Sequence, residues 1–342
     1  MKQSRIFSVA VASAAVLGSV VAVSGTANAA FDPDTADRVT TNDQLGVEGD
    51  TYPTTGWFLG DVAAPAGTVT FDGAGLNSAG GNVQVLNAYD APASTLTDLV
   101  LDADFVSLGD ATFQVPMFVN DTGTGTQFTT LRPVATGDAG FTADSAWITS
   151  QAFGTYVAGA QATLAEFQAS IDAIDADGDQ AADATVLAYG FITPSPLTSS
   201  VQAVAFGDES TWFIPAPTGT YQPATLTVTQ ARTTGITVDG GGFFPNEALE
   251  VYFAVENAAS ASPLDVTLTA DAQGRVQGTV VIPADAVPAA GTYFITIGGL
   301  ESGVTLQGTV TVLADGAVVT PVPAGPTAPV AVPVRANAAF TG

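Results

Sequence analysis

The sequence predicts an all-β protein made of two successive β-sandwiches, and three observations support this prediction. Short runs rich in Val, Thr and Phe, roughly four to nine residues long, recur along residues 57–313 and end at Gly, Asp, Asn or Pro. Hydrophobic residues make up 46% of the chain and charged residues only 12%, which argues against disorder over most of its length. Residues 215–223 are rich in proline and glycine, and they divide the runs into a larger and a smaller group.

The first 29 residues have the composition of a secretory signal peptide. Lys2 and Arg5 provide a positive start, residues 6–23 are apolar or small, and Ala27-Asn28-Ala29 fits the small-x-small cleavage rule. A retained membrane anchor is the alternative, but serine and glycine interrupt the apolar run, which favours cleavage. Residues 30–56 are polar, and we expect them to form an arm with at most one short strand.

Residues 57–214 predict a jelly-roll-like sandwich with one helix. Many short strands at this spacing are typical of such folds. For the helix, Thr163 and Glu166 form a capping box, and four apolar residues that follow the cap share one face: Leu164, Phe167, Ile171 and Ile174. The strands are expected at 56–59, 68–71, 82–89, 97–101, 111–119, 127–133, 146–150, 184–191, 200–206 and 210–214.

Residues 215–223 are predicted to be a linker that leaves the two units without a shared core. Beyond it, residues 224–313 contain seven alternating segments in about 90 residues, the size and strand number of an immunoglobulin-like (Ig-like) sandwich. These strands are expected at 225–229, 235–238, 249–255, 264–269, 278–282, 292–297 and 305–313.

Three segments of this smaller unit resemble a known family. They are GFFPNEALEV at 242–251, ADAQGRVQGT at 270–279 and AGTY at 290–293. They look like the Ig-like modules of secreted and wall-anchored surface proteins of high-GC Gram-positive bacteria. The resemblance implies that this unit is a spacer or stalk.

Residues 314–342 form a proline-rich tail, which we interpret as a semi-rigid wall spacer. The tail ends in Ala339, Phe340, Thr341 and Gly342, which resemble the last four positions of a Leu-Ala-x-Thr-Gly sortase signal. The resemblance implies cleavage between Thr341 and Gly342 and an amide link from Thr341 to the wall. Ala338 stands where Leu is expected and no apolar segment follows in this sequence, so a plain disordered end is the alternative.

The composition excludes several kinds of chemistry. The chain has no His and no Cys, and its lysine is Lys2 in the signal peptide, so Ser-His-Asp and Cys-His hydrolysis, His- or Cys-bound zinc and Schiff-base lysines are ruled out. A net charge of −26 repels nucleic acid and anionic lipid surfaces. We therefore expect neither a nucleic-acid nor a membrane partner for the mature chain, and no enzymatic activity.

Two candidate sites remain open. Asp175, Asp177, Asp179 and Asp183 follow the helix at alternate positions and are suited to a calcium ion, although Gln180 and Val186 exclude a true EF-hand; a solvated acidic turn is the alternative. Trp57 is a candidate for stacking against a sugar, with core packing as the alternative. Two further tryptophans, Trp147 and Trp212, lie inside apolar runs and are assigned to the core.

These observations predict a non-enzymatic, exported, wall-associated surface protein. Residues 57–214 would form a binding domain for adhesion or display, and the Ig-like unit would be its stalk. Its ligand would be a cell-wall or extracellular glycan or protein. The alternative is a secreted carbohydrate-binding or glycan-cleaving protein acting through the same residues. A concave surface lined by aromatic residues and paired acids would favour the alternative, and a closed smooth sandwich would favour display.

Overall fold

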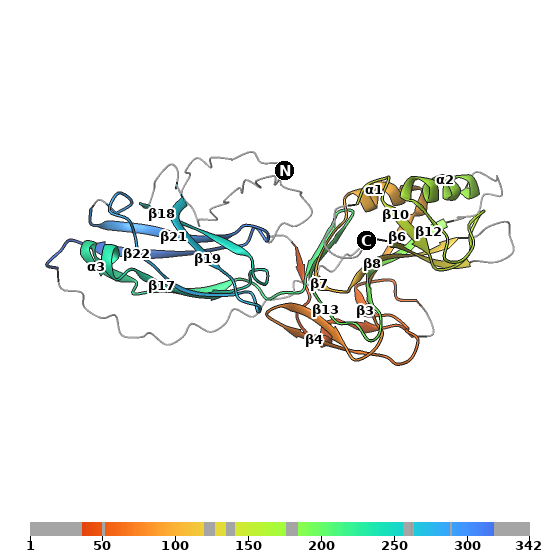
Figure 1. Cartoon of the computed structure of the whole chain (residues 1–342), viewed down its shortest axis with the longest axis horizontal. Coiled ribbons are helices and arrows are strands. Elements are labelled where there is room, and N and C mark those ends of the chain that lie inside the picture. The colour runs from red at the N-terminus through yellow and green to blue at the C-terminus, as the bar shows by residue number, and fades with distance from the viewer. Residues whose placement is uncertain are drawn as a thin grey trace, which may run out of the picture.

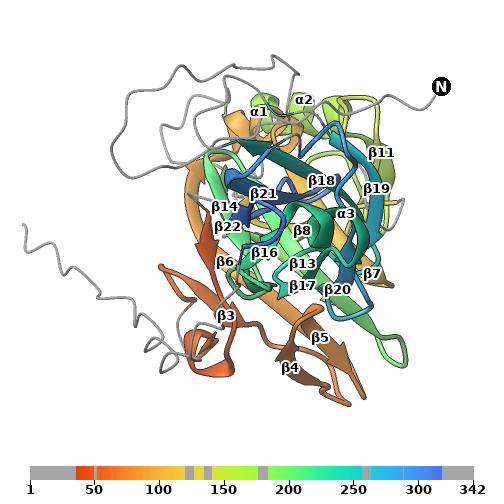
Figure 2. The ribbon, with the colours of Figure 1, turned by 90° about the vertical axis from the view of Figure 1, so that its left-hand side faces the viewer.

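A computed structural model describes residues 36–49, 52–119, 127–134, 141–175, 184–255, 261, 263–287 and 289–317. Two lobes follow one another along the long axis (Figure 1). Seen along that axis, the second lobe lies in front of the first (Figure 2). Each lobe consists of packed β-sheets, so the predicted all-β architecture with sandwich-like packing is confirmed.

The first unit contains two sheets. Sheet A has the order β1-β14-β13-β5-β4, with β7 on the other side of β13, and sheet B has the order β11-β10-β9-β8-β12-β6-β3-β2. The strands of sheet A are β1 (Asp37–Arg38), β4 (Thr68–Asp72), β5 (Gly75–Ala79), β7 (Asp104–Gly109), β13 (Ser199–Phe206) and β14 (Glu209–Trp212). Those of sheet B are β2 (Gly46–Val47), β3 (Trp57–Leu59), β6 (Val83–Pro92), β8 (Thr112–Val119), β9 (Gln127–Pro133), β10 (Ala146–Thr149), β11 (Gln161–Thr163) and β12 (Ala184–Thr193).

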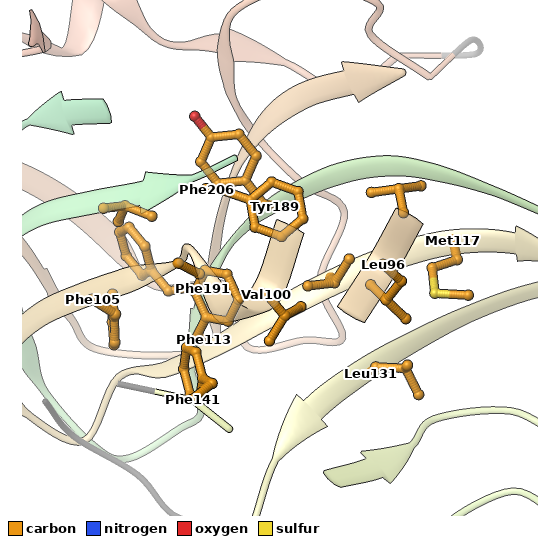
Figure 3. Close-up of a cluster of buried hydrophobic side chains, with 14 of the residues drawn as sticks. Leu96, Val100, Phe105, Phe113, Met117, Leu131, Phe141, Tyr189, Phe191 and Phe206 are labelled. Carbon is orange, nitrogen blue, oxygen red and sulfur yellow. The ribbon is translucent and has the colours of Figure 1, made fainter. Parts of the chain in front are cut away.

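An aromatic core fills the space between the two sheets (Figure 3). The ring of Phe105 on β7 lies 6.0 Å from that of Phe113 on β8 and 5.9 Å from that of Phe191 on β12. Phe206 on β13 stacks on Tyr189 at 4.8 Å. Because alternate residues of a strand point to one face, Tyr189 and Phe191 of β12 both enter this core.

Two helices cover the rest of the inner face of sheet B. α2 (Leu164–Asp175) is the predicted helix, and its capping box is present: Glu166 N–H donates to Thr163 Oγ1 at 3.2 Å, and Thr163 N–H donates to the Glu166 carboxylate at 2.8 Å. α1 (Leu96–Leu101) replaces the strand predicted at 97–101, so that prediction is wrong. Leu96 and Val100 are both fully buried while Asp98 between them is exposed, which fits the helical and not the strand period.

The segment expected to be an arm joins the two sheets. It contains two short strands where at most one was expected: β1 pairs in parallel with β14 of sheet A, and β2 pairs in parallel with β3 of sheet B. A 3-10 turn, η1 (Asn42–Gln44), lies between them, and Val39 belongs to the core. A second 3-10 turn, η2 (Ala93–Thr95), precedes α1.

The second unit has the Ig-like arrangement of two facing sheets. One has the order β15-β17-β20 and the other β16-β22-β21-β18-β19. The strands are β15 (Thr218–Gln222), β16 (Thr225–Thr227), β17 (Ile236–Gly241), β18 (Ala248–Val255), β19 (Pro263–Thr269), β20 (Arg275–Val280), β21 (Gly291–Gly299) and β22 (Thr305–Leu313). The strand predicted at 225–229 ends at Thr227, because Thr227 caps α3 (Val228–Thr233) by accepting from Gln230 N–H.

The predicted linker is wrong in two respects. Five of its residues form β15, which pairs with β17 across its whole length. The two units also share a core: Trp212 on β14 is fully buried and stacks on Phe244 of the second unit, with ring centroids 5.2 Å apart. Ala203 and Ile214 belong to the same buried cluster. One face of sheet A therefore packs against sheet B, and its other face packs against the second unit.

Two further contacts tighten this junction. Arg38 Nη1 donates to the carbonyl oxygens of Ile214 at 3.0 Å and Pro215 at 3.2 Å, while its guanidinium lies 5.1 Å from the centre of the Trp212 ring. The turn between β4 and β5 approaches the second unit so closely that a Cβ at Gly73 would collide with the carbonyl oxygen of Gln273. The joint is packed, and Gly73 is required for that approach.

Candidate functional site

Most of the residues predicted to carry function lie outside the described residues. These are the signal peptide, Asp177, Asp179, Asp183 and the tail positions Ala339, Phe340, Thr341 and Gly342. Asp175 is the last residue of α2. The calcium and sorting predictions therefore stay predictions. Within the described residues, no group of three or more acids could hold a metal ion, and no helix is long and apolar enough to cross a membrane.

Trp57 is not available for sugar stacking. Only 6% of it is exposed, and its indole N–H donates to Thr211 Oγ1 at 3.0 Å. Its ring packs edge-on against Phe213 at 4.9 Å and Tyr189 at 5.6 Å. Trp57 begins β3 with its side chain between the sheets, so the core interpretation is correct and the stacking prediction is wrong. Trp147 and Trp212 are fully buried, as expected.

A carboxylate beside this core is engaged by the protein itself. Glu209 Oε2 accepts from Tyr189 Oη at 2.9 Å and from Asn87 Nδ2 at 3.0 Å. Desolvation raises the pKa of Glu209, and the hydrogen bond from Tyr189 partly opposes this increase. Because Tyr189 and Asn87 are buried, the cluster ties β14 to sheet B and does not present a free acid.

Glu247, in the second unit, is bound still more completely. It is 1% exposed and accepts from Phe244 N–H at 2.8 Å, from Glu301 N–H at 3.0 Å and from Ser302 through both N–H and Oγ. Every bond comes from a turn of the same unit. The geometry identifies Glu247 as a structural group that holds two turns together.

The surface best suited to binding is the outer face of sheet B, which points away from sheet A. We call it the aromatic face and define it by Tyr52, which precedes β3, and by Phe58, Gln114, Phe118, Phe128 and Arg132 on the strands. Phe118 and Phe128 are direct cross-strand partners with rings 6.0 Å apart, and Phe128 is 41% exposed. Phe58 and Gln114 are buried, so the accessible side chains of this face are those of Tyr52, Phe118, Phe128 and Arg132.

The aromatic face is concave. The Tyr52 ring lies 5.4 Å from the Phe58 ring on β3 and 6.5 Å from the Phe128 ring on β9. Four strand-to-strand steps separate β3 from β9, about 19 Å in a flat sheet. One ring can approach both because the sheet curls around Tyr52. β12, in the middle of the sheet, carries register shifts against both of its neighbours, and such bulges bend a sheet.

Three polar atoms of the aromatic face are buried without a hydrogen-bond partner: Tyr52 Oη, Gln114 Oε1 and Arg132 Nε. Gln114 is fully buried, and its amide nitrogen makes one long bond of 3.5 Å to Phe191 O. Desolvation raises the pKa of Tyr52 and lowers that of Arg132. Buried polar atoms are normally paired, but Trp147 Nε1 in the core and Arg232 Nε in the second unit are unpaired as well, so these three atoms do not by themselves mark a binding site.

Gln114 and Arg132 lie close together on this face. Val115 on β8 and Leu131 on β9 are cross-strand partners in an antiparallel pair, and Gln114 and Arg132 are their neighbours at the same end of that pair. Arg132 in turn pairs with Ile148 on β10. Among the described residues, no carboxylate forms an ion pair with Arg132; the ion pair found there joins Arg275 to Asp239 in the second unit, at 3.1 Å.

Comparisons with known proteins do not assign a family. No family model and no curated protein matches the chain. A solved structure of a tetra-tandem repeat in the extending region of a large adhesion protein is similar at 15% sequence identity, covering 75% of this chain and 76% of that one. Its TM-score is 0.22, so the similarity carries no argument about fold or function.

The sequence contained a weak signal for the aromatic face. Phe58, Phe118, Phe128 and Arg132 lie within strands that the sequence predicts, at the positions that alternate with the core residues. Apolar residues on both faces of a strand indicate that the second face is also covered or used. Tyr52 carries no such signal, because it belongs to a segment predicted to be a polar arm.

Proposed function

We propose that this protein is a non-enzymatic, exported surface protein that binds an extracellular partner through its aromatic face. The single observation that carries the proposal is the concave outer face of sheet B, where the rings of Tyr52, Phe118 and Phe128 come together. Phe128 is 41% exposed and lies beside the half-buried rings of Phe118 and Tyr52, and clustered accessible apolar side chains are typical of binding surfaces. The second unit is the spacer that holds this face away from the cell, and the tail is the attachment to the wall.

A glycan-cleaving function is the second candidate, because aromatic residues on a concave face were expected for it. Glycoside hydrolysis also requires a pair of carboxylates about 5–10 Å apart. The carboxylate of Glu48 lies close enough to Tyr52 to raise the pKa of that tyrosine, but it accepts a hydrogen bond from Asp61 N–H at 2.8 Å. Glu209 and Glu247 are engaged in hydrogen bonds elsewhere. Aromatic rings without paired acids favour binding over cleavage.

The test is a binding screen of purified residues 30–342 against arrayed extracellular glycans and proteins, with two matched variants. Phe128→Asp changes a 41% exposed ring on the aromatic face, and Val281→Asp changes a 43% exposed side chain of the second unit. We expect Phe128→Asp to weaken binding at least tenfold and Val281→Asp to leave it unchanged. Equal binding by all three proteins would overturn the proposal, as would release of reducing sugar that one acid substitution abolishes.

A further inference from the structure

We infer that a short N-terminal segment is a strap that locks the joint between the two units, and that the joint becomes a hinge when the strap leaves. We call this segment the N-terminal strap and define it by Ala36, Asp37, Arg38 and Val39. The inference goes beyond the proposed binding function, because it concerns how rigidly the second unit is joined to the first. It follows from the two cores that the strap reaches, from its bonds to the connecting chain and from its place at the edge of sheet A.

The N-terminal strap packs against the cores of both units. Val39 is buried in the cluster of the first unit, whereas Ala36, three residues earlier, packs against the cluster of the second unit. The chain that connects the two units makes the same crossing, because Phe213 belongs to the first cluster and Ile214 to the second. The joint is therefore crossed twice, once by the covalent connection and once by the strap.

Backbone pairing and one arginine hold the N-terminal strap to the connecting chain. β1 pairs in parallel with β14, and Val39 N–H donates to Trp212 O at 3.0 Å, just beyond the last strand pair. Arg38 Nη1 donates to Ile214 O at 3.0 Å and to Pro215 O at 3.2 Å, so the guanidinium reaches the residues that follow β14. The same guanidinium lies 5.1 Å from the centre of the Trp212 ring. Because a charged donor makes stronger hydrogen bonds than a neutral one, Arg38 is the main attachment of the strap.

The N-terminal strap can leave while both units stay folded. β1 is two residues long and lies at the edge of sheet A, so among the described strands its release breaks the pairing with β14 alone. Short edge segments with few buried contacts open locally at a lower free energy than the core. Without the strap, the Trp212 ring loses the Arg38 guanidinium, and the stack of Trp212 on Phe244 remains as an aromatic contact across the joint. Two units joined by a small contact area move relative to one another, so the open joint is a hinge.

The experiment measures the distance between one spin label on each unit of residues 30–342 by pulsed electron paramagnetic resonance. The chain has no cysteine, so two introduced cysteines are unique labelling sites. Val157→Cys in the first unit and Val281→Cys in the second replace side chains that are 70% and 43% exposed. We expect a narrow distance distribution when the strap is intact. Arg38→Gln should make the distribution about twice as wide, because an open joint adopts many angles, and Arg38→Lys should lie between the two, because the charge returns without the planar fork.

Two truncated chains and one point variant complete the test. A chain that begins at Thr40 lacks the strap and should widen the distribution at least as much as Arg38→Gln, whereas a chain that begins at Ala36 retains the strap and should not. Arg275→Gln is the matched control, because it removes an arginine whose ion pair with Asp239 lies within the second unit. Circular dichroism should show the same strand content in every protein. A narrow distribution in both Arg38→Gln and the chain from Thr40, or a broad one in the unchanged protein, would overturn the inference. Loss of strand content in both of these variants would overturn it too, because the segment would then be part of the fold and not a removable strap.

Discussion

Replacing Trp212 by Ala removes the side chain that joins the cores of the two units. Trp212 is fully buried and stacks on Phe244, with ring centroids 5.2 Å apart. The Arg38 guanidinium lies 5.1 Å from the centre of the Trp212 ring. Large-to-small changes of buried Trp cost about 3–5 kcal/mol, because transfer free energy is lost and a cavity remains. For a unit of this size each kcal/mol lowers the melting temperature by about 2–4 °C, so we expect a decrease of roughly 6–20 °C.

Differential scanning calorimetry of residues 30–342 provides the assay. The shared core predicts that the wild-type units unfold together or with strongly overlapping transitions, and that Trp212→Ala separates them. Limited proteolysis should then cut near residues 215–217 in the variant at temperatures where the wild type resists. Trp147→Ala is the matched control, since that Trp is equally buried but belongs to the core of the first unit alone. Two well-separated wild-type transitions, of which Trp212→Ala moves only one, would refute the coupling.

Two further predictions concern carboxylates. Burial raises the pKa of Glu209, so the folded state binds this proton more tightly than the unfolded chain, and the stability that Glu209 provides is greatest below its ordinary value near 4.3 and decreases as pH rises. In urea unfolding, the free energy of unfolding of Glu209→Gln minus that of the wild type should therefore be more positive at pH 7 than at pH 4. A difference in the opposite direction would contradict the desolvation argument. For the acidic segment after α2, millimolar calcium should raise the melting temperature, because calcium at 100 times its Kd would increase the free energy of unfolding by about 2.7 kcal/mol. Asp177→Ala should abolish this increase. Identical traces in calcium and in chelator would leave a solvated turn.

Much of the local structure could be predicted because it depends on neighbours in the sequence. The capping box at Thr163 and Glu166 determines where α2 begins, and alternation with turn residues identified most strands of both units. The segment at 97–101 was misassigned because a short apolar run fits either period, and only the exposure of Asp98 between the buried Leu96 and Val100 distinguishes them. β15 was missed because proline and glycine around it are typical of a linker, while its pairing with β17 depends on a distant strand.

The sequence by itself excluded particular kinds of chemistry: the chain has no His and no Cys, so Ser-His-Asp and Cys-His hydrolysis and His- or Cys-bound zinc are absent from any fold it adopts. It also determined the all-β class, since the strand period depends only on residues that are adjacent in the sequence. Only the tertiary structure decided which tryptophan joins the two units and which aromatic residues reach a surface. Trp57 and Trp212 both lie in predicted strands, and their roles depend on which sheet faces which. The aromatic face likewise needs Tyr52, Gln114 and Arg132 brought together from separate segments by strand pairing and sheet curvature, which no local pattern encodes.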